Sequence, residues 1–252
     1  MIAILGAMPQ EVQLIASSLE ACHEVDLVGR RFLWGRLRGR EVLVAFSRWG
    51  KVAAAATVSA AITRFPIDAV VFTGVAGGLD PACRVGDVVV AKTLVQHDLD
   101  ARPLFEQFEI PLSGIRYIEA NVAIQRALVR AVGRFVERGL DGLAVNLRAF
   151  GLTRPAVHEG LIASGDRFVA DARVSSELKA ALPSALCVEM EGAAVAQVCV
   201  ESKIPFGVVR TISDTADHGA PVDFPKFLEA LASHFSLGVV LEFLSDELAF
   251  EA

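Results

Sequence analysis

The stretch from Cys187 to Asp217 constrains the fold most strongly, because it reads as a buried strand, a small helix and a second buried strand. The apolar runs 186–188 and 205–212 are the strands, and the small residues of 192–200 form the helix between them. In open α/β sheets, ligand sites lie in the crevice outside the carboxyl ends of the strands. Acidic residues stand at both ends here, and they are Glu189, Glu191, Asp214 and Asp217. We therefore expect a ligand site where these strands end.

The rest of the chain continues this alternation. Further strands are expected at 2–5, 69–73, 85–95 and 158–164, with a hairpin formed by 31–37 and 42–47. Helices are expected from Pro9, after Gly50, and over 121–138, 170–182 and 223–247, the last with Asp223 as N-cap and Pro225 in its first turn. Residues 139–156 are expected to be irregular. The pattern predicts one domain over residues 1–252, a three-layer α/β fold with a mixed, mostly parallel sheet flanked by helices.

The charge and the apolar pattern exclude several classes of partner. The chain has 24 basic and 30 acidic residues, a net charge of −6, and no run of Lys or Arg. Binding to a nucleic-acid backbone is therefore not expected. The N-terminus lacks a basic leader segment, and no uncharged apolar run reaches the roughly 18 residues of a membrane helix. The four cysteines show no CxxC spacing, which is typical of a reduced, cytoplasmic protein.

His97, Asp98 and Asp100 are the residues that come closest to a metal-ligand cluster. They lie close together after the strand at 85–95, but no helical HxxxH pair and no clear third or fourth ligand accompanies them. Neither a P-loop nor a GxGxxG fingerprint is present. We therefore expect neither a metal nor a cofactor.

Three carboxylates are predicted to lie at strand exits, and they suggest a reaction class. Glu11 falls in the first turn of the helix that follows the first strand, where it could also be a carboxylate that interacts with the helix dipole. Glu191 and Asp214 follow the two strands described above. No serine or cysteine stands in a nucleophile elbow. Paired carboxylates, one acting as acid and one as base, suit cleavage of a glycosidic bond through a cationic transition state.

Two loops have both a functional and a structural interpretation. The turn TGVAGGLD, with Gly74, Gly77 and Gly78, allows close approach of the backbone to a phosphate or ribose, or is a tight turn. The aromatic loop at 101–118, with Phe105 and Phe108, could cover an apolar ligand, pack a subunit contact or simply pack on itself. The sequence alone leaves these alternatives open.

Four blocks give the chain a specific resemblance. They are ILGAMPQEV, FTGVAGGL with VGDVVV, SGDRFV, and VEMEGAAVA followed by VVRTISDTAD, and they extend from residue 2 to residue 217. In these blocks the chain resembles the 5′-methylthioadenosine/S-adenosylhomocysteine nucleosidases of the nucleoside phosphorylase superfamily. The resemblance implies a single α/β domain around a mixed, partly closed sheet, and usually a homodimer.

The resemblance also implies roles for the acidic residues. Glu11 would activate the attacking water, and Asp214 would donate a hydrogen bond or proton to N7 of adenine, with Ser213 helping to place Asp214. Glu191, as an anion, would accept bonds from the ribose hydroxyls. Anionic carboxylates near the sugar favour a transition state with oxocarbenium character.

Other residues would hold the substrate. Phe168 would contact the adenine ring or plug the core, and Val169 would offer backbone bonds to the base. Arg210 would point toward the water or anion site. The remaining residues of the predicted site are Met190 on the ribose, Val75 and Gly77 in the glycine-rich turn, and Phe105 and Phe108 in the aromatic loop.

Two departures from the family pattern bear on the reaction. Val75 stands where these nucleosidases commonly carry serine, and its side chain cannot donate to phosphate, which favours hydrolysis over phosphorolysis. The region 97–111 also differs, and in the family it helps to form the pocket for the 5′ substituent, partly from the neighbouring subunit. We expect release of adenine from the nucleosides named above, in methionine salvage. The alternatives are a phosphorylase, a nucleosidase for another purine nucleoside such as futalosine, and a non-catalytic nucleoside-binding module.

Overall fold

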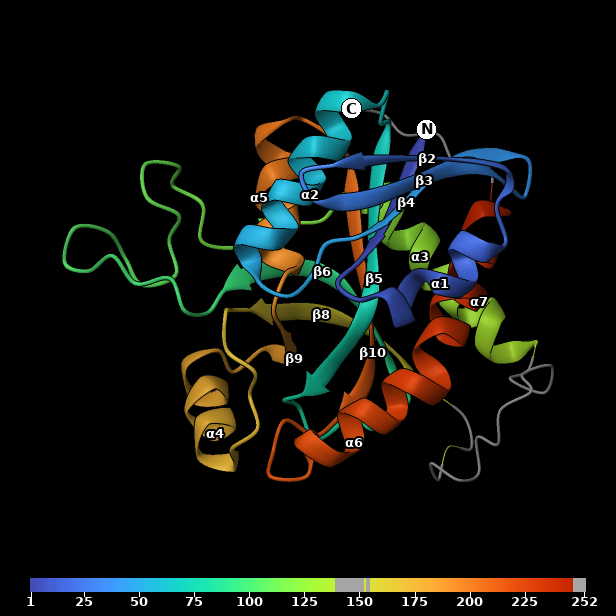
Figure 1. Ribbon diagram of the computed structural model, residues 1–252. Coiled ribbons are helices and arrows are strands. Elements are labelled where there is room, and N and C mark those ends of the chain that lie inside the picture. The colour runs from blue at the N-terminus through green and yellow to red at the C-terminus, as the bar shows by residue number, and fades with distance from the viewer. Residues whose placement is uncertain (139–151, 153–154, 247–252) are drawn as a thin grey trace.

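The computed structural model describes residues 1–138, 152 and 155–246, so most of the 139–156 stretch lies outside the described residues. A ten-stranded mixed sheet forms the centre of the molecule (Figure 1). The strands are β1 (Ile2–Gly6), β2 (Glu20–Leu27), β3 (Arg30–Leu37), β4 (Arg40–Phe46), β5 (Ala69–Gly78), β6 (Val88–Gln96), β7 (Ile118–Glu119), β8 (Val157–Ser164), β9 (Ala185–Glu189) and β10 (Phe206–Asp214). β5 and β10 are almost continuously buried, as expected for apolar strands that are covered on both faces.

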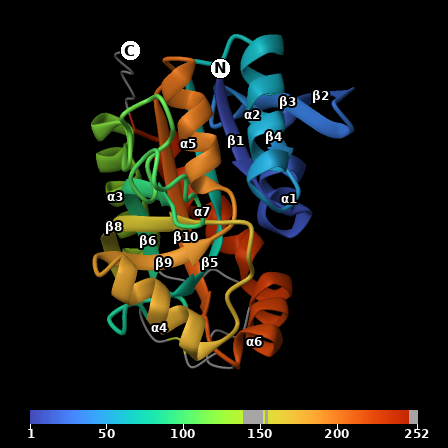
Figure 2. The ribbon, with the colours of Figure 1, turned by 90° about the vertical axis from the view of Figure 1, so that its left-hand side faces the viewer.

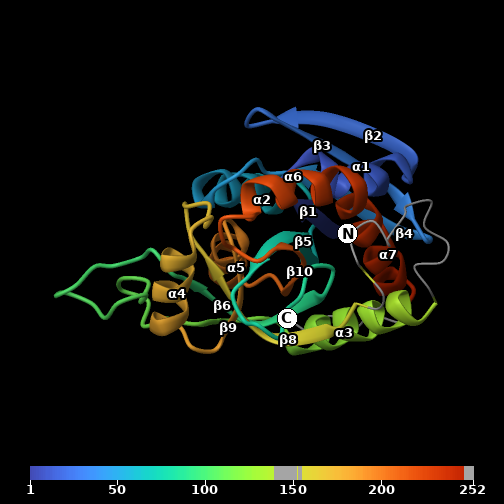
Figure 3. The ribbon, with the colours of Figure 1, turned by 90° about the horizontal axis from the view of Figure 1, so that it is seen from below.

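The sheet is partly closed. β1 pairs in parallel with β4 on one side and β5 on the other, and β5 pairs in parallel with β10. From β10 the pairing continues through β6, β8 and β9 and returns to β5, so these strands lie around a common centre (Figure 3). Among the described residues, five pairings are parallel and five antiparallel. The mixed sheet is confirmed, and its antiparallel share is larger than expected, because ring closure adds β5–β9 and β6–β10 to the hairpin pairings.

Helices pack on both sides of the sheet. They are α1 (Pro9–Ser17), α2 (Lys51–Arg64), α3 (Val122–Glu137), α4 (Ala172–Ala181), α5 (Gly192–Glu201), α6 (Ala220–Phe227), the π-helical segment η3 (Leu228–Ala232) and α7 (Ser233–Leu244). α2 packs against α5, whereas α7 packs against α1 and α3 (Figures 1 and 2). Asn121 and Asp171 cap α3 and α4 by accepting bonds from the first backbone amides. The predicted single α/β architecture is confirmed.

Two local predictions need correction. The expected hairpin is the second half of a three-stranded meander, because β2 precedes it; β2 is mostly exposed and carries no apolar period that would reveal it. The expected closing helix begins at Ala220 with Gly219, not Asp223, as its N-cap. Pro221 occupies the first turn, so Pro225 falls inside α6, and the chain passes through η3 before α7.

The last helices form the longest apolar stretch of the described chain. By length and composition, the 22 residues Asp223–Leu244 would suffice to cross a membrane. Within the fold, 61% of their most apolar window is buried, as in the core helix of a soluble protein. All four cysteines are free thiols, and Cys83, Cys187 and Cys199 are buried.

Candidate active site

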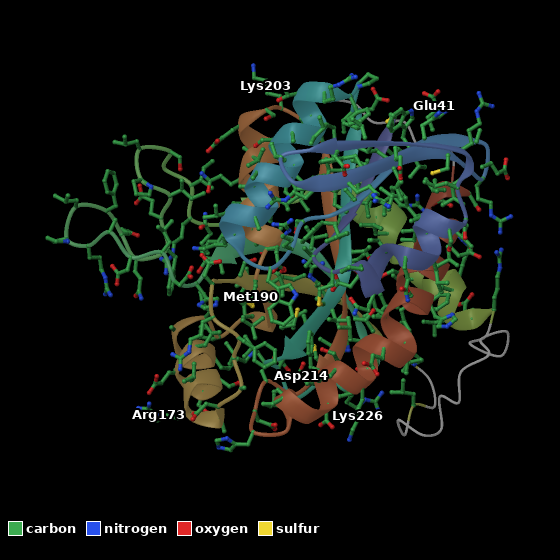
Figure 4. All side chains as sticks on the ribbon, in the orientation of Figure 1. Glu41, Arg173, Met190, Lys203, Asp214 and Lys226 are labelled. Carbon is green, nitrogen blue, oxygen red and sulfur yellow. The ribbon has the colours of Figure 1, made fainter. Side chains whose placement is uncertain are left out.

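A cavity of about 520 Å³ opens at the carboxyl ends of β1, β5, β9 and β10. Figure 4 shows Met190 and Asp214 in this region, with α6 beside them. Most of the predicted site residues line the cavity, and they are Glu11, Val75, Gly77, Phe168, Val169, Met190, Glu191, Ser213 and Asp214. Sequence positions more than 200 residues apart therefore meet at one end of the sheet, as predicted.

Glu11 is held by backbone amides from two segments. Its Oε2 accepts from the amides of Ala7, at 2.6 Å, and Met8, at 2.9 Å, and its Oε1 accepts from the amide of Val75 at 3.0 Å. Burial raises the pKa of Glu11, while the charge of Arg210 and these three amides act in the opposite direction. The carboxylate is thus fixed in position and, once ionised, is a suitable base for a water molecule.

Asp214 ends β10 after an irregularity in its pairing with β5. Its Oδ2 accepts from the hydroxyl of Ser213 at 2.8 Å, and its Oδ1 accepts from the amide of Ala216 at 2.9 Å. Burial raises the pKa of Asp214, and this favours the protonated form that an acid needs. Gly77 is required here, because a Cβ at this position would lie 2.9 Å from Asp214 Oδ1.

Glu191 occupies the position just before α5. Its Oε1 accepts from the amide of Gly50 at 2.8 Å, and its Oε2 lies 4.0 Å from Arg210 Nη2. Burial and the neighbouring Glu189 carboxylate raise the pKa of Glu191 to about 8. Both effects favour the protonated carboxyl in the ligand-free protein, whereas the predicted role uses Glu191 as an anion.

Arg210 lies behind the cavity and is almost completely buried. Its Nη2 and Nε donate to Glu189 Oε2 at 2.5 and 3.2 Å, and its guanidinium stacks over the ring of Phe72, 4.4 Å from the centroid. Among the described residues, its Nη1 has no hydrogen-bond partner. An ideal Cβ on Gly74 would lie 2.9 Å from Nη1 and 2.5 Å from Glu11 Oε1. The unsatisfied donor and the candidate base therefore lie on the same side of Gly74.

Phe105 and Phe108 are not part of the cavity formed within one chain. Phe108 is buried in an apolar cluster that includes Val95, Leu161 and Val169, and the guanidinium of Arg116 lies 5.4 Å from its ring centroid. The rest of the loop projects from the body of the molecule on the left of Figure 1.

Asp98 and Asp100, the acidic residues that lie near His97 in the sequence, bind other groups of the protein. No group of three or more His, Cys, Asp or Glu side chains suited to a metal occurs in the described part of the chain. Asp98 accepts from Lys51 Nζ at 2.6 Å and from the amide of Asp166 at 2.8 Å, and Asp100 pairs with Arg102.

Comparison with known proteins agrees with this geometry. The model of the phosphorylase superfamily matches residues 1–245. A curated 5′-methylthioadenosine/S-adenosylhomocysteine nucleosidase of Geobacillus kaustophilus is 38% identical over 244 residues, which are 96% of each chain. The chain belongs to this nucleosidase family of the phosphorylase superfamily.

Solved structures of nucleosidases agree over the whole fold. The enzyme of Neisseria meningitidis in complex with methylthio-immucillin-A is 33% identical, with a TM-score of 0.84 over 96% of this chain and 97% of that one. The enzyme of Colwellia psychrerythraea in complex with adenine is 32% identical, with a TM-score of 0.86 over 96% and 93%. The predicted family, fold and enzyme class, an N-glycosyl hydrolase of purine nucleosides, are confirmed.

Three residues of the nucleosidase site escaped prediction from sequence. The ring of Phe224, on α6, makes edge-on contacts with Phe168 at 5.5 Å and Trp49 at 5.9 Å, and all three line the cavity. Glu189 also lines it and binds Arg210. Glu189 carried the same signal as Glu191, since both follow the apolar run 186–188, but Trp49 and Phe224 carried only their aromatic character.

Proposed function

We propose that this protein hydrolyses the N-glycosidic bond of 5′-methylthioadenosine, S-adenosylhomocysteine or both, and releases adenine. One observation carries the proposal: Glu11, Glu191 and Asp214 converge on one cavity, beside an unsatisfied guanidinium nitrogen of Arg210. The names of the related nucleosidases, and the adenine and methylthio-immucillin-A found in two of their structures, support the same substrate class.

In this proposal Glu11 and Asp214 act at opposite ends of the bond. Glu11 takes a proton from a water molecule, whose oxygen Arg210 Nη1 orients, and that oxygen bonds to C1′ of the ribose. The bond between C1′ and N9 breaks, and its electron pair goes to the purine. Asp214 gives its proton to N7, so that adenine leaves as a neutral molecule. The hydroxyl of Ser213 holds the Asp214 carboxyl in place.

The other cavity residues bind the two parts of the nucleoside. Glu191 and Met190 hold the ribose, and a protonated Glu191 can both donate to and accept from the sugar hydroxyls. Phe168 and the backbone of Val169 hold the base, while Val75, whose amide binds Glu11, and Gly77, which lies beside Asp214, also line the cavity. Trp49 and Phe224 extend the apolar wall toward the exposed rim.

We further propose that the enzyme is a cytoplasmic homodimer that works in methionine salvage. Within one chain, the loop at 101–118 lies away from the cavity. Phe105 would reach a nucleoside only from the loop of a second subunit, next to its 5′ substituent, whereas Phe108 is buried in its own chain and would support that loop. Sedimentation of the purified protein tests the dimer, and a monomer at catalytic concentrations contradicts it.

A substrate panel tests the function. 5′-Methylthioadenosine, S-adenosylhomocysteine, adenosine, inosine and futalosine are each incubated with the protein, with and without phosphate, and free base and sugar phosphate are quantified. We expect adenine and free sugar without phosphate, because Val75 offers no hydroxyl to a phosphate ion. Turnover only with phosphate would make the protein a phosphorylase, and preference for futalosine would change the assigned substrate. Binding without any turnover would indicate a nucleoside-binding module.

A further inference from the structure

Glu189 is a buried carboxylate that the proposed reaction does not use. It ends β9 and is 6% exposed. Its Oε2 accepts both bonds from the guanidinium of Arg210 on β10. Its Oε1 accepts from the hydroxyl of Ser164 at the end of β8. One carboxylate therefore links β8, β9 and β10.

The same carboxylate also fixes the beginning of α5. Its Oε2 accepts from the backbone amides of Glu191 at 3.1 Å and Gly192 at 2.8 Å, and its Oε1 lies 3.0 Å from the Gly192 amide. The Ser164 hydroxyl accepts from the next amide, that of Ala193, at 2.8 Å. The side chain of Glu191 does not cap the helix. Glu189 thus holds the backbone from which Glu191 enters the cavity.

The orientation of Arg210 follows from these contacts. Glu189 occupies Nε and Nη2, and the ring of Phe72 supports the face of the guanidinium. Within the described part of the chain Nη1 has no hydrogen-bond partner, and it lies beside Gly74 and Glu11. An arginine presents its donors in a rigid plane, so fixing two nitrogens fixes the direction of the third.

We propose that Glu189 is a positioning residue for hydrolysis: it aims Arg210 Nη1 at the water beside Glu11 and sets the place of Glu191 at the sugar. This role rests on the proposed function, because it presupposes a water at Glu11 and a ribose at Glu191. It extends that function by assigning a task to a carboxylate that needs no contact with the reacting atoms.

The effect of the Glu189 charge on the pKa of Glu191 provides a second, independent test of the positioning role. Glu191 faces Glu189 on β9, Arg210 on β10, Glu11 on α1 and the Gly50 amide before α2. The negative charge of Glu189 raises the pKa of Glu191, whereas Arg210 lowers it. Loss of the Glu189 charge would remove the first effect and leave Arg210 without its main partner. Both changes lower the pKa of Glu191.

Glu189→Gln is the direct test, with adenine release from 5′-methylthioadenosine as the assay. Glutamine can fit, because its amide nitrogen can face the Ser164 hydroxyl while its oxygen faces Arg210. We expect kcat to fall by roughly tenfold to a hundredfold, the scale for misplaced catalytic groups, with KM changed much less. The apparent pKa that Glu191 contributes to the pH profile of kcat/KM should be lower in Glu189→Gln than in the wild type.

Matched variants separate positioning from general damage. Glu177→Gln removes an equal charge from the exposed surface of α4 and should leave kcat and the pH profile unchanged. Ser164→Ala removes one bond to Glu189 but no charge, and it should lower kcat without moving the profile. A folded Glu189→Gln protein with wild-type kcat and profile overturns the proposal.

If Glu189→Gln does not fold, the kcat of Ser164→Ala tests the positioning role instead. A wild-type kcat in Ser164→Ala overturns that role. Wild-type protein that releases no adenine would contradict the proposed function itself. An active wild type with an unaffected Glu189→Gln variant would contradict only the positioning role.

Discussion

Replacing Glu191 by glutamine should stabilise the protein increasingly as the pH rises. The folded chain keeps a proton on Glu191 up to about pH 8, whereas an exposed glutamate in the unfolded chain loses it near its ordinary pKa of 4.5. Between these two values the folded state binds more protons than the unfolded state, so the free energy of unfolding falls as pH rises. The wild type therefore loses stability over this window because of the burial of Glu191.

The structure sets the size of this effect. The interval from 4.5 to about 8, at about 1.4 kcal/mol per pH unit, corresponds to about 5 kcal/mol. Glutamine has no proton to hold and can still accept from the Gly50 amide, which now donates to Glu191 Oε1 at 2.8 Å. Any other contact changed by the substitution adds a constant offset. The pH dependence of the difference therefore isolates the ionisation of Glu191.

Urea unfolding at pH 5, 6, 7 and 8 measures that difference. The free energy of unfolding of Glu191→Gln minus that of the wild type should grow by about 1.4 kcal/mol per pH unit across this range. Glu177→Gln, on the exposed face of α4, should show no such growth. A difference between Glu191→Gln and wild type that stays constant from pH 5 to pH 8 would refute the reasoning.

Three further predictions concern the cavity. Glu11→Gln and Asp214→Asn should each lower kcat by roughly a hundredfold or more with little change in melting temperature, and near-normal turnover would remove the assigned role. Gly74→Ala should lower kcat by about a hundredfold, because its Cβ would lie 2.5 Å from Glu11 Oε1 and displace the base; wild-type kcat would show that the carboxylate moves without consequence. Adenine binding should change the tryptophan fluorescence of the wild type and of Trp34→Phe but not of Trp49→Phe, because only Trp49 lines the cavity; a retained signal in Trp49→Phe would contradict this.

Much of the site could be predicted because its residues follow buried strands. Glu11 lies in the helix after β1, Glu191 lies two residues after β9, and Asp214 is the last residue of β10. Because β1 and β10 are both parallel to β5, their carboxyl ends meet at one edge of the sheet. The apolar runs themselves mark the strands, since strands covered on both faces need continuous hydrophobic residues. The position of each carboxylate at the cavity was therefore available from local pattern alone.

The missing parts depend on contacts between distant segments. The role of Glu189 arises from Arg210, on a different strand, and from the first amides of α5, so no local pattern contains it. The protonation of Glu191 arises from burial, which one chain segment cannot set. Phe105 and Phe108 were placed at the cavity by resemblance, yet their loop projects away from it. Aromatic composition predicts neither the direction of a loop nor its partner.

The surroundings of Glu11 and Asp214 fit the proposed base and acid without reference to any motif. Both are buried, and burial raises the pKa of both. Glu11 accepts from three backbone amides and faces the positive Arg210, so its neighbours favour the ionised form. Asp214 accepts from one amide and one hydroxyl, which lower its pKa, whereas the negative charges of Asp217 and Asp223 raise it and favour the protonated form. The charged neighbours of the two carboxyls therefore act on their pKa in opposite directions, as a base and an acid require.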